Sequence, residues 1–285
     1  MYRQNTRLLI KDYSILIPNI SLIKRALLLI IFGVSTSGFC QKLNFESSIS
    51  KSNFNRENIL RHLFDGIYES EKQCISWKPK PEEITLTSDN DSSYTYLDSI
   101  YKYTSSTDVY CVVVLNTIQY IEGIGQTCHG CSPSELGLAL YKEENEKWKL
   151  LKLQSGVNQI GYSGILPPAS IIELGKDKFG IHFKEEDHQV NIESNLGYVY
   201  SVDSISFSKN VLTYKQNDVI EYYDQPLIEE GSINIIKTEN DYFDIQLVLE
   251  TRRYMDKGFK MIKTKSITYK CFDSNWYFAS EQNKW

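Results

Sequence analysis

A series of short β-forming segments, joined by connections too short to contain a helix, constrains this chain more than any other feature. From residue 84 onward, stretches rich in Val, Ile, Thr and Tyr alternate apolar with polar positions, which is typical of strands. Turn-forming residues separate them, as at positions 88–90, 240–241, 256–258 and 273–275. Parallel strands need a long crossover, so these short connections predict antiparallel pairing, most clearly in the C-terminal third of the chain.

The predicted strands cover most of the chain. They are expected at residues 84–87, 94–103, 109–119, 171–174, 179–183, 198–207, 211–214, 233–238, 242–250, 260–269 and 276–279. The composition agrees, because 20 Tyr and only 4 Ala among 285 residues disfavour a helical bundle. The sequence therefore predicts a mainly β fold, an antiparallel sandwich or strongly curved sheet, with one N-terminal helix packed on it.

The one long helix is expected at residues 53–74. Asn53 or Asn55 can cap its start, and apolar residues then recur at helical spacing up to Tyr68. Prolines 79 and 81 lie beyond its predicted end. Residues 41–285 are interpreted as a single mainly β domain. The Gly- and Pro-containing stretch 155–170 is either a long loop or a boundary that subdivides this domain, and the sequence favours the loop.

Residues 1–40 have the order of a bacterial-style signal peptide. Lys24 and Arg25 precede an apolar run at 26–34, and small residues follow before Cys40. The run is shorter than the roughly 20 residues that cross a bilayer as a helix. We therefore expect an exported protein, periplasmic or extracellular, without a membrane span after cleavage. The leader is unusually long, or translation starts further in; the sequence leaves both open.

Cys40 is a poor site for lipid anchoring, because Phe39 stands where a lipoprotein signal has a small residue. Cleavage after Cys40 would leave Gln41 as the first residue. Residues 1–40 carry five Lys or Arg and one Asp, so their removal changes the net charge from −5 to −9. An acidic chain with a pI near 5.5 does not fit nucleic acid as a partner.

The sharpest local motif is Cys128-His129-Gly130-Cys131. A disulfide that staples an exposed loop is the favoured interpretation in an oxidising compartment. A redox pair of Cys128 and Cys131 would need a helix after the motif, whose dipole stabilises a thiolate. Ser132, Pro133 and Glu135 fit a helix start, but residues 136–153 alternate as in a β-hairpin, which we favour. Metal binding by Cys128, His129 and Cys131 is a weaker alternative, since the sequence offers no second Cys-x-x-Cys pair.

The remaining cysteines are expected to be structural, with Cys111 buried in an apolar strand and Cys74 able to bridge Cys271. Other catalytic patterns are incomplete: Gly161-Tyr162-Ser163-Gly164-Ile165 lacks the last Gly of a nucleophile elbow, and Asp89-Asn90-Asp91 lacks the remaining ligands of a calcium loop. His62, His182 and His188 are interpreted as helix, sheet and surface residues respectively. No cofactor is expected.

Tyr94 and Tyr96 are predicted on one face of a strand, and Tyr101 and Tyr103 on the other. Exposed rings of this kind bind glycans or proteins, but the favoured interpretation is that they form cross-strand pairs and line the core. The function we predict is therefore a non-catalytic binding or interaction protein of a bacterial envelope, with a protein or glycan as partner. The alternative is an extracytoplasmic enzyme or thiol-redox protein that uses Cys128 and Cys131.

Overall fold

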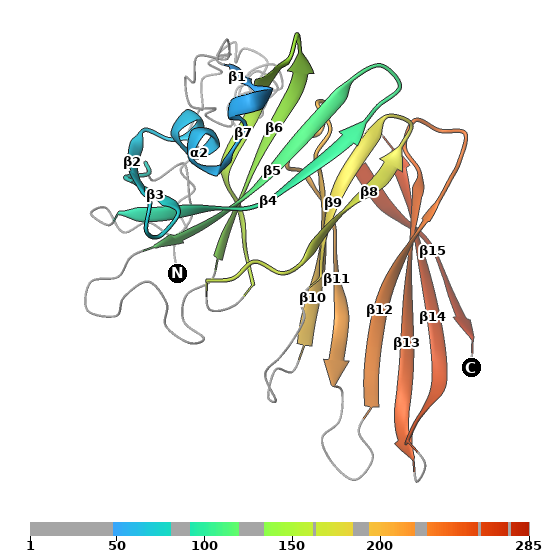
Figure 1. Cartoon of the computed structure of the whole chain (residues 1–285). Helices are drawn as coiled ribbons and strands as arrows, with labels where there is room; N and C mark the ends of the chain where they lie inside the picture. Colours follow the sequence, from blue (N-terminus) through green and yellow to red (C-terminus); the bar gives the residue numbers. More distant parts are fainter. Residues whose placement is uncertain are drawn as a thin grey trace, which may run out of the picture. The chain divides into compact units, whose positions relative to one another are not determined.

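In the residues that the structure describes, the chain forms two antiparallel sheets, one short α-helix and one 3₁₀ turn (Figure 1). The structure, a computed structural model, describes residues 48–80, 92–119, 134–161, 164–184, 194–219, 227–255, 258–272 and 275–284. The first sheet has the strand order β1-β7-β6-β5-β4-β3-β2, and the second has the order β15-β14-β13-β12-β11-β10-β9-β8. The predicted mainly β fold, with antiparallel, strongly curved sheet and one N-terminal helix, is confirmed.

The first sheet is a meander closed at one edge by a short N-terminal strand. Its strands are β1 (Ser48–Ser50), β2 (Gly66–Glu69), β3 (Cys74–Trp77), β4 (Ser93–Thr104), β5 (Val109–Gln119), β6 (Ser134–Glu144) and β7 (Lys147–Ile160). Strands β2 to β7 pair in sequence order, while β1 pairs with β7. Strands β6 and β7 form the β-hairpin predicted for 136–153, so the helical alternative for that segment is wrong.

The helix α2 (Arg56–Leu63) follows the 3₁₀ turn η1 (Lys51–Asn53) and is shorter than predicted. Asn55 caps α2, its side chain accepting a hydrogen bond from the Asn58 backbone N–H at 3.0 Å. The helix ends because Phe64 is extended and Gly66 begins β2, where a Cβ would stand 2.4 Å from the Ser76 carbonyl oxygen. Residues 66–77, predicted as helix up to Cys74, therefore form the β2–β3 hairpin instead.

The first sheet is covered on both faces. One face packs against α2 through the helix-side core, in which Ile59, Leu60 and Leu63 are fully buried. The other face packs against the second sheet through the inter-sheet core, which includes Leu138 and Leu140 from β6 and Phe183 and Tyr200 from the second sheet. The stretch 155–170 contains the end of β7 and the connection into the second sheet.

The second sheet is a meander of eight strands in sequence order. They are β8 (Ala169–Gly175), β9 (Lys178–Lys184), β10 (Ser194–Ser201), β11 (Asn210–Val219), β12 (Leu227–Ile236), β13 (Asp244–Met255), β14 (Gly258–Phe272) and β15 (Asn275–Lys284). The strand predicted at 198–207 is too long, because β10 ends at Ser201. Asp203 then holds a turn by accepting backbone N–H bonds from Ile205 and Ser206 at 2.8 and 2.9 Å.

The second sheet curls until its first strand contacts the start of β13. Gly175 forms a bridge with Tyr242, and the Phe243 N–H donates to the Leu174 carbonyl at 2.8 Å. Glycine is needed at this contact, since a Cβ on residue 175 would lie 2.1 Å from the Asp241 carbonyl oxygen. The curl encloses a further apolar cluster, the curl core, made of Leu174, Val199, Leu212, Tyr214, Ile245 and Leu247.

Candidate functional site

The cysteines that the structure describes are free thiols. Cys74 and Cys111 are buried and Cys271 is half-buried, and the term free here means only that none of the three forms a disulfide, so the Cys74–Cys271 bridge that the sequence allowed is absent. Burial raises the pKa of the Cys111 thiol to about 12, and it also raises the pKa of Cys74. Thiols with raised pKa values are poor nucleophiles. Cys111 is therefore the buried structural thiol that the sequence predicted.

Cys40 and the motif residues Cys128, His129 and Cys131 lie outside the described residues, so the loop disulfide stays a prediction. The flanking strands are described, however. β5 ends at Gln119 and β6 begins at Ser134. The segment from Ser134 is thus a strand, and it does not provide the helix N-terminus that the redox hypothesis placed there.

The four tyrosines of β4 lie on one face of the first sheet, whereas the sequence placed them on two. A β-bulge between Leu97 and Ser99 shifts the register by one residue. Tyr94 and Tyr96 pair with Ile118 and Asn116, while Tyr101 and Tyr103 pair with Val112 and Tyr110. All four partners have even numbers on β5, and residues directly opposite in antiparallel strands share a face. A single inserted residue therefore reverses the predicted alternation.

Two of these tyrosines join the sheets. The Tyr101 hydroxyl donates to the Ala169 carbonyl at 2.8 Å, and the Tyr103 hydroxyl donates to the Val202 carbonyl at 3.0 Å. Burial raises the pKa of Tyr103, so the phenol remains protonated and able to donate. These rings act as internal ties between β4 and the second sheet.

The other two tyrosines are half-buried at the β3 side of β4. The Lys72 ammonium lies 4.7 Å from the Tyr94 ring centroid, a cation–π contact, and Tyr96 hydrogen-bonds the Cys74 thiol. The four tyrosines predicted to bind a partner thus have two roles: Tyr101 and Tyr103 hydrogen-bond the second sheet, and Tyr94 and Tyr96 contact residues next to β4. They do not form one open aromatic platform.

A chain of buried polar side chains runs through the end of the first sheet where β3 ends and β6 begins. The Trp77 indole N–H donates to the Thr95 hydroxyl at 2.8 Å, and Thr95 hydrogen-bonds Thr117 at 2.8 Å. Thr117 pairs with Glu135, whose side chain is fully buried. Sequence reasoning treated Glu135 only as a helix-start residue. Its signal was a carboxylate placed directly before the apolar run of β6.

The two described histidines are hydrogen-bonded inside the fold. His62 of α2 contacts the buried Tyr141 hydroxyl at 3.0 Å, which joins the helix to the sheet. His182 of β9 contacts the Tyr214 hydroxyl at 2.8 Å. Burial lowers the pKa of His182 to about 4, with a smaller contribution from the Lys184 charge, so the ring is neutral at pH 7. The interpretation of His182 as a satisfied sheet residue agrees with this geometry.

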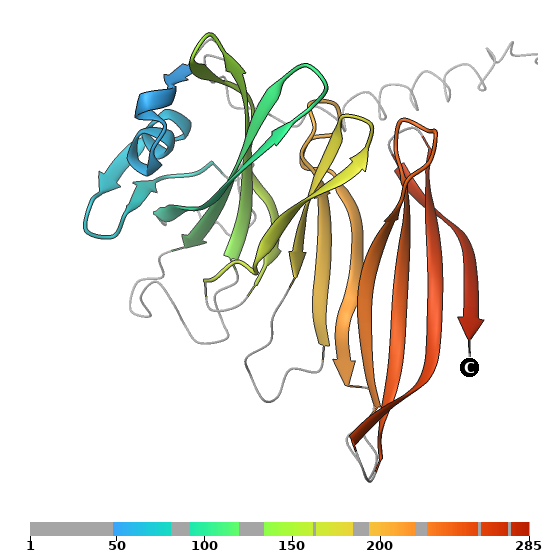
Figure 2. The same cartoon turned by 45° about the vertical axis from the view of Figure 1, so that its right-hand side comes forward.

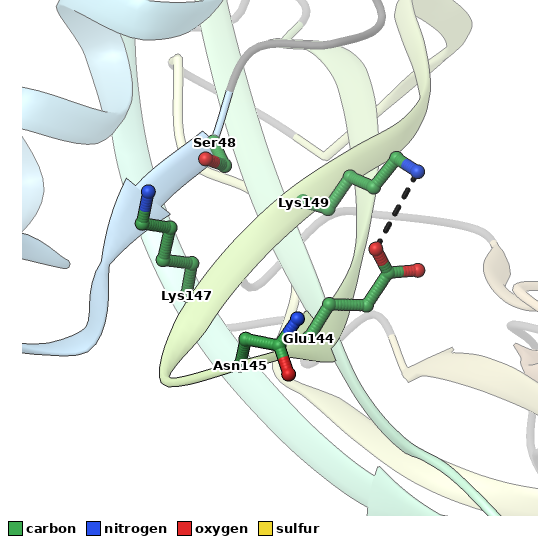
Figure 3. Close-up of a pocket in the computed structure, with 5 residues that line it drawn as sticks. All are labelled: Ser48, Glu144, Asn145, Lys147 and Lys149. Atoms are coloured by element: carbon green, nitrogen blue, oxygen red, sulfur yellow. Dashed lines mark ion pairs between the residues drawn. The ribbon is translucent and has the colours of Figure 1, made fainter.

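A small hollow of about 290 Å³ lies beside the β6–β7 turn (Figure 3). It is lined by Ser48, Glu144, Asn145, Lys147 and Lys149, and Glu144 forms an ion pair with Lys149 at 3.4 Å. Its charges are thus partly compensated. It offers neither an apolar floor nor a convergent set of polar groups, which are the usual features of a ligand pocket.

The end of the β13–β14 hairpin has the densest set of exposed apolar side chains in the described part of the chain. Tyr254, Met255, Phe259 and Met261 are 48%, 45%, 48% and 50% exposed. Tyr254 and Phe259 face each other across the hairpin, with ring centroids 5.3 Å apart and an edge-to-face angle of 72°. Exposed apolar side chains that gather in one place mark interaction sites more often than scattered ones do. This hairpin end is the strongest candidate site, and the sequence analysis missed it.

Two kinds of feature are absent from the described residues. Among them, no group of three or more His, Cys, Asp or Glu side chains could hold a metal ion. In the same residues, no helix is long and apolar enough to cross a membrane.

Comparison with known proteins adds no assignment: no family model matches the chain, and neither a curated protein nor a solved structure matches it. The function must therefore be argued from the residues of this chain.

Proposed function

We propose that this chain is an exported protein of a bacterial envelope that acts as a non-catalytic binding module, with the end of the β13–β14 hairpin as its contact surface. The observation that carries the proposal is the exposed cluster of Tyr254, Met255, Phe259 and Met261. Aromatic residues and Met are enriched where proteins contact their partners, because they offer large contact areas that adapt to another surface. About half of the surface of each of these side chains is open to solvent and available for contact.

Export is supported by the N-terminal sequence. The basic pair Lys24-Arg25, the apolar run 26–34 and the small residues before Cys40 follow the order of a secretory signal. The non-catalytic part is supported by how the described titratable groups are used. His182 is held by Tyr214, and the buried Asp203 accepts bonds from the turn that it organises.

The alternative, a thiol-redox protein that uses Cys128 and Cys131, stays a prediction without supporting geometry. Its physical basis was a helix beginning just after Cys131. A strand begins there instead, at Ser134. The strand that begins at Ser134 therefore does not supply the helix dipole that would stabilise a Cys128 thiolate.

The test is site-specific photo-crosslinking in cells that export the protein. A benzophenone amino acid replaces Tyr254 in one strain and Ile67 in the control strain. Ile67 is 75% exposed but lies on the short strand β2, away from this hairpin. Benzophenone inserts into C–H bonds of proteins, glycans and lipids alike. We expect many adducts from position 254 and few from position 67. We also expect the intact mass of the exported protein to match a chain that begins at Gln41.

Equal adduct yields at the two positions would contradict the hairpin end as the contact surface. An intact mass that still includes residues 1–40 would contradict cleavage, and a diacylglyceryl adduct on Cys40 would show lipid anchoring. Insulin reduction by the purified protein, lost when Cys128 is replaced by Ser, would favour the thiol-redox alternative.

A further inference from the structure

The end of the β13–β14 hairpin extends beyond both neighbouring strands (Figure 2). On one side, the first residue of β12, Leu227, pairs with Arg253. On the other side, the described part of β15 ends at Lys284, which pairs with Thr264. The hairpin continues past these positions to the pair Met255–Gly258. Among the described residues, the last pairs of the hairpin therefore have no paired strand on one or both edges.

The apolar content of this end is unusual for the chain. The sequence has 3 Met, and the two that follow Met1 are Met255 and Met261, both at this hairpin. Tyr254 and Phe259 share one face of the hairpin with Met261, since they are directly opposite or two residues apart. Two rings and two thioethers are thus concentrated at one narrow projection.

Cations flank these apolar groups. Arg253 and Lys260 are paired across the hairpin and exposed on the face opposite to Tyr254 and Phe259. Arg252 forms ion pairs with Glu230 at 3.0 Å and with Glu250 at 2.9 Å. The described residues 252–255 and 258–263 carry four Lys or Arg and no Asp or Glu, in a chain whose net charge is −5. The hairpin is therefore a cationic segment of an acidic protein.

We propose that this hairpin end docks into the headgroup region of an anionic lipid bilayer, as a peripheral contact. The inference rests on the proposed function, because it takes the same hairpin end as the contact surface and names the chemistry of its partner. Aromatic rings and long cationic side chains are the pair of groups that favours the boundary between headgroups and acyl chains. Anionic headgroups attract Lys and Arg near the surface.

A bilayer fits this end better than a protein does. A stable protein interface buries about 800 Å² on each partner, and a projection two strands wide presents only a few side chains. Aromatic residues, Met and Arg occur in protein interfaces too, but Lys is depleted there, whereas the surface of an anionic membrane attracts it. The negative charge of the rest of the chain restricts the contact to this end, because the remaining surface is repelled by anionic lipid.

The experiment measures co-sedimentation of the purified exported protein with vesicles. One set contains phosphatidylglycerol in phosphatidylcholine, and the other is phosphatidylcholine alone. Two double variants remove the two kinds of group: Tyr254→Ser with Phe259→Ser, and Arg253→Gln with Lys260→Gln. The matched controls are Ile67→Ser, an exposed apolar residue elsewhere, and Lys270→Gln, an exposed cation at the far end of β14.

We expect wild-type protein to prefer the anionic vesicles and to lose this binding at high salt. Replacing the two cations should weaken binding roughly 30-fold, because each charge near the surface contributes about fivefold. Replacing the two rings should weaken it by roughly tenfold or more. Both controls should bind like wild type. Circular dichroism of each variant verifies that it is folded.

Equal binding to the two vesicle types, or variants that bind like the controls, would overturn the lipid proposal. If position 254 nevertheless crosslinks to a protein or glycan in cells, the lipid proposal fails and the binding function stands. If the protein does not bind anionic vesicles and position 254 gives no adducts in cells, both proposals fail.

Discussion

Strands β5 and β6 of the first sheet and strands β13 and β14 of the second are both long antiparallel pairs, but they differ in how they are covered. Every residue of β6 from Ser134 to Tyr141 is buried. In β13, by contrast, only Ile245, Leu247 and Thr251 are buried. Both pairs are antiparallel, and they differ in the backbone only by the β-bulge at Thr251–Arg252 in β13. What differs is the number of elements packed on their faces.

The comparison assigns different tasks to the two regions. The first sheet lies between α2 and the second sheet, so its side chains determine stability. The β13–β14 hairpin leaves the protection of the curl core as it extends toward Met255, and its exposed residues there contribute little to folding. Surface substitutions away from special features usually change stability by about 0.5 kcal/mol or less. Residues at this end are therefore free to be used for contact.

The largest expected effect comes from matched leucine truncations in the two regions. Leu138→Ala removes a fully buried side chain of the inter-sheet core and should cost about 3–5 kcal/mol of unfolding free energy, from lost transfer energy plus the cavity. Leu249→Ala truncates a partly buried residue beside the curl core, so we expect less than half that loss. Urea unfolding followed by tryptophan fluorescence measures both.

Equal losses for the two leucines would break the comparison, because they would show that β13 is as tightly packed as β6. A change in the slope of the unfolding curve, in addition to its midpoint, would show that the two sheets do not unfold together.

The sequence already indicated that β5 is buried on both faces and β13 on one face only, and this explains why the fold was predictable. Residues 109–115 form an almost unbroken apolar run, which is typical of a strand buried on both faces. The residues of β13 alternate instead, as expected for a strand with one sheltered face. Strand identity and antiparallel order followed from these patterns and from the short turns. The end of α2 did not, because Ile67 and Tyr68 fit helical spacing until the close contact of Gly66 with β3 is known.

The candidate site was less predictable, for two physical reasons. The bulge at Leu97–Ser99 moves Tyr101 and Tyr103 to the same face as Tyr94, and a bulge has no reliable sequence signal. The exposure of Tyr254 depends on whether the neighbouring strands extend as far as this residue. That depends on where β12 begins and where β15 ends. The local charge of positions 252–263 was the available signal. Taken with Met255 and Met261, it could have pointed to this hairpin.

A second effect, of intermediate size, is the pH dependence of the unfolding free energy. It tests which part of the second sheet is closed to solvent. The His182 side chain is 5% exposed and has a folded-state pKa of about 4, below the ordinary value of 6.5. As the pH falls through 6.5 the unfolded chain binds a proton that the folded chain refuses, so stability is lost between about pH 6.5 and pH 4. Between pH 7 and pH 5 this amounts to about 2 kcal/mol.

The measurement is the unfolding free energy of wild type and of His182→Gln at pH 7 and pH 5. The difference between the two proteins isolates His182, because all other titrating groups are shared. We expect wild type to lose more stability than the variant by about 2 kcal/mol. Parallel losses would show that the imidazole is open to solvent, and that the closed part of the second sheet is smaller than the Gly175–Tyr242 bridge indicates.

The smallest expected effect comes from removing one hydroxyl in each region. Tyr103→Phe deletes the donor to the Val202 carbonyl and leaves that buried acceptor without this bond, which should cost about 1 kcal/mol. Tyr254→Phe deletes a hydroxyl that is already open to water, so stability should change by about 0.5 kcal/mol or less. The two variants lose the same atom from the same residue type, and only its surroundings differ. Equal midpoints of urea unfolding for the two would mean that the hydroxyl of Tyr103 is as well solvated as that of Tyr254, and β4 would then not be tied to the second sheet at this point.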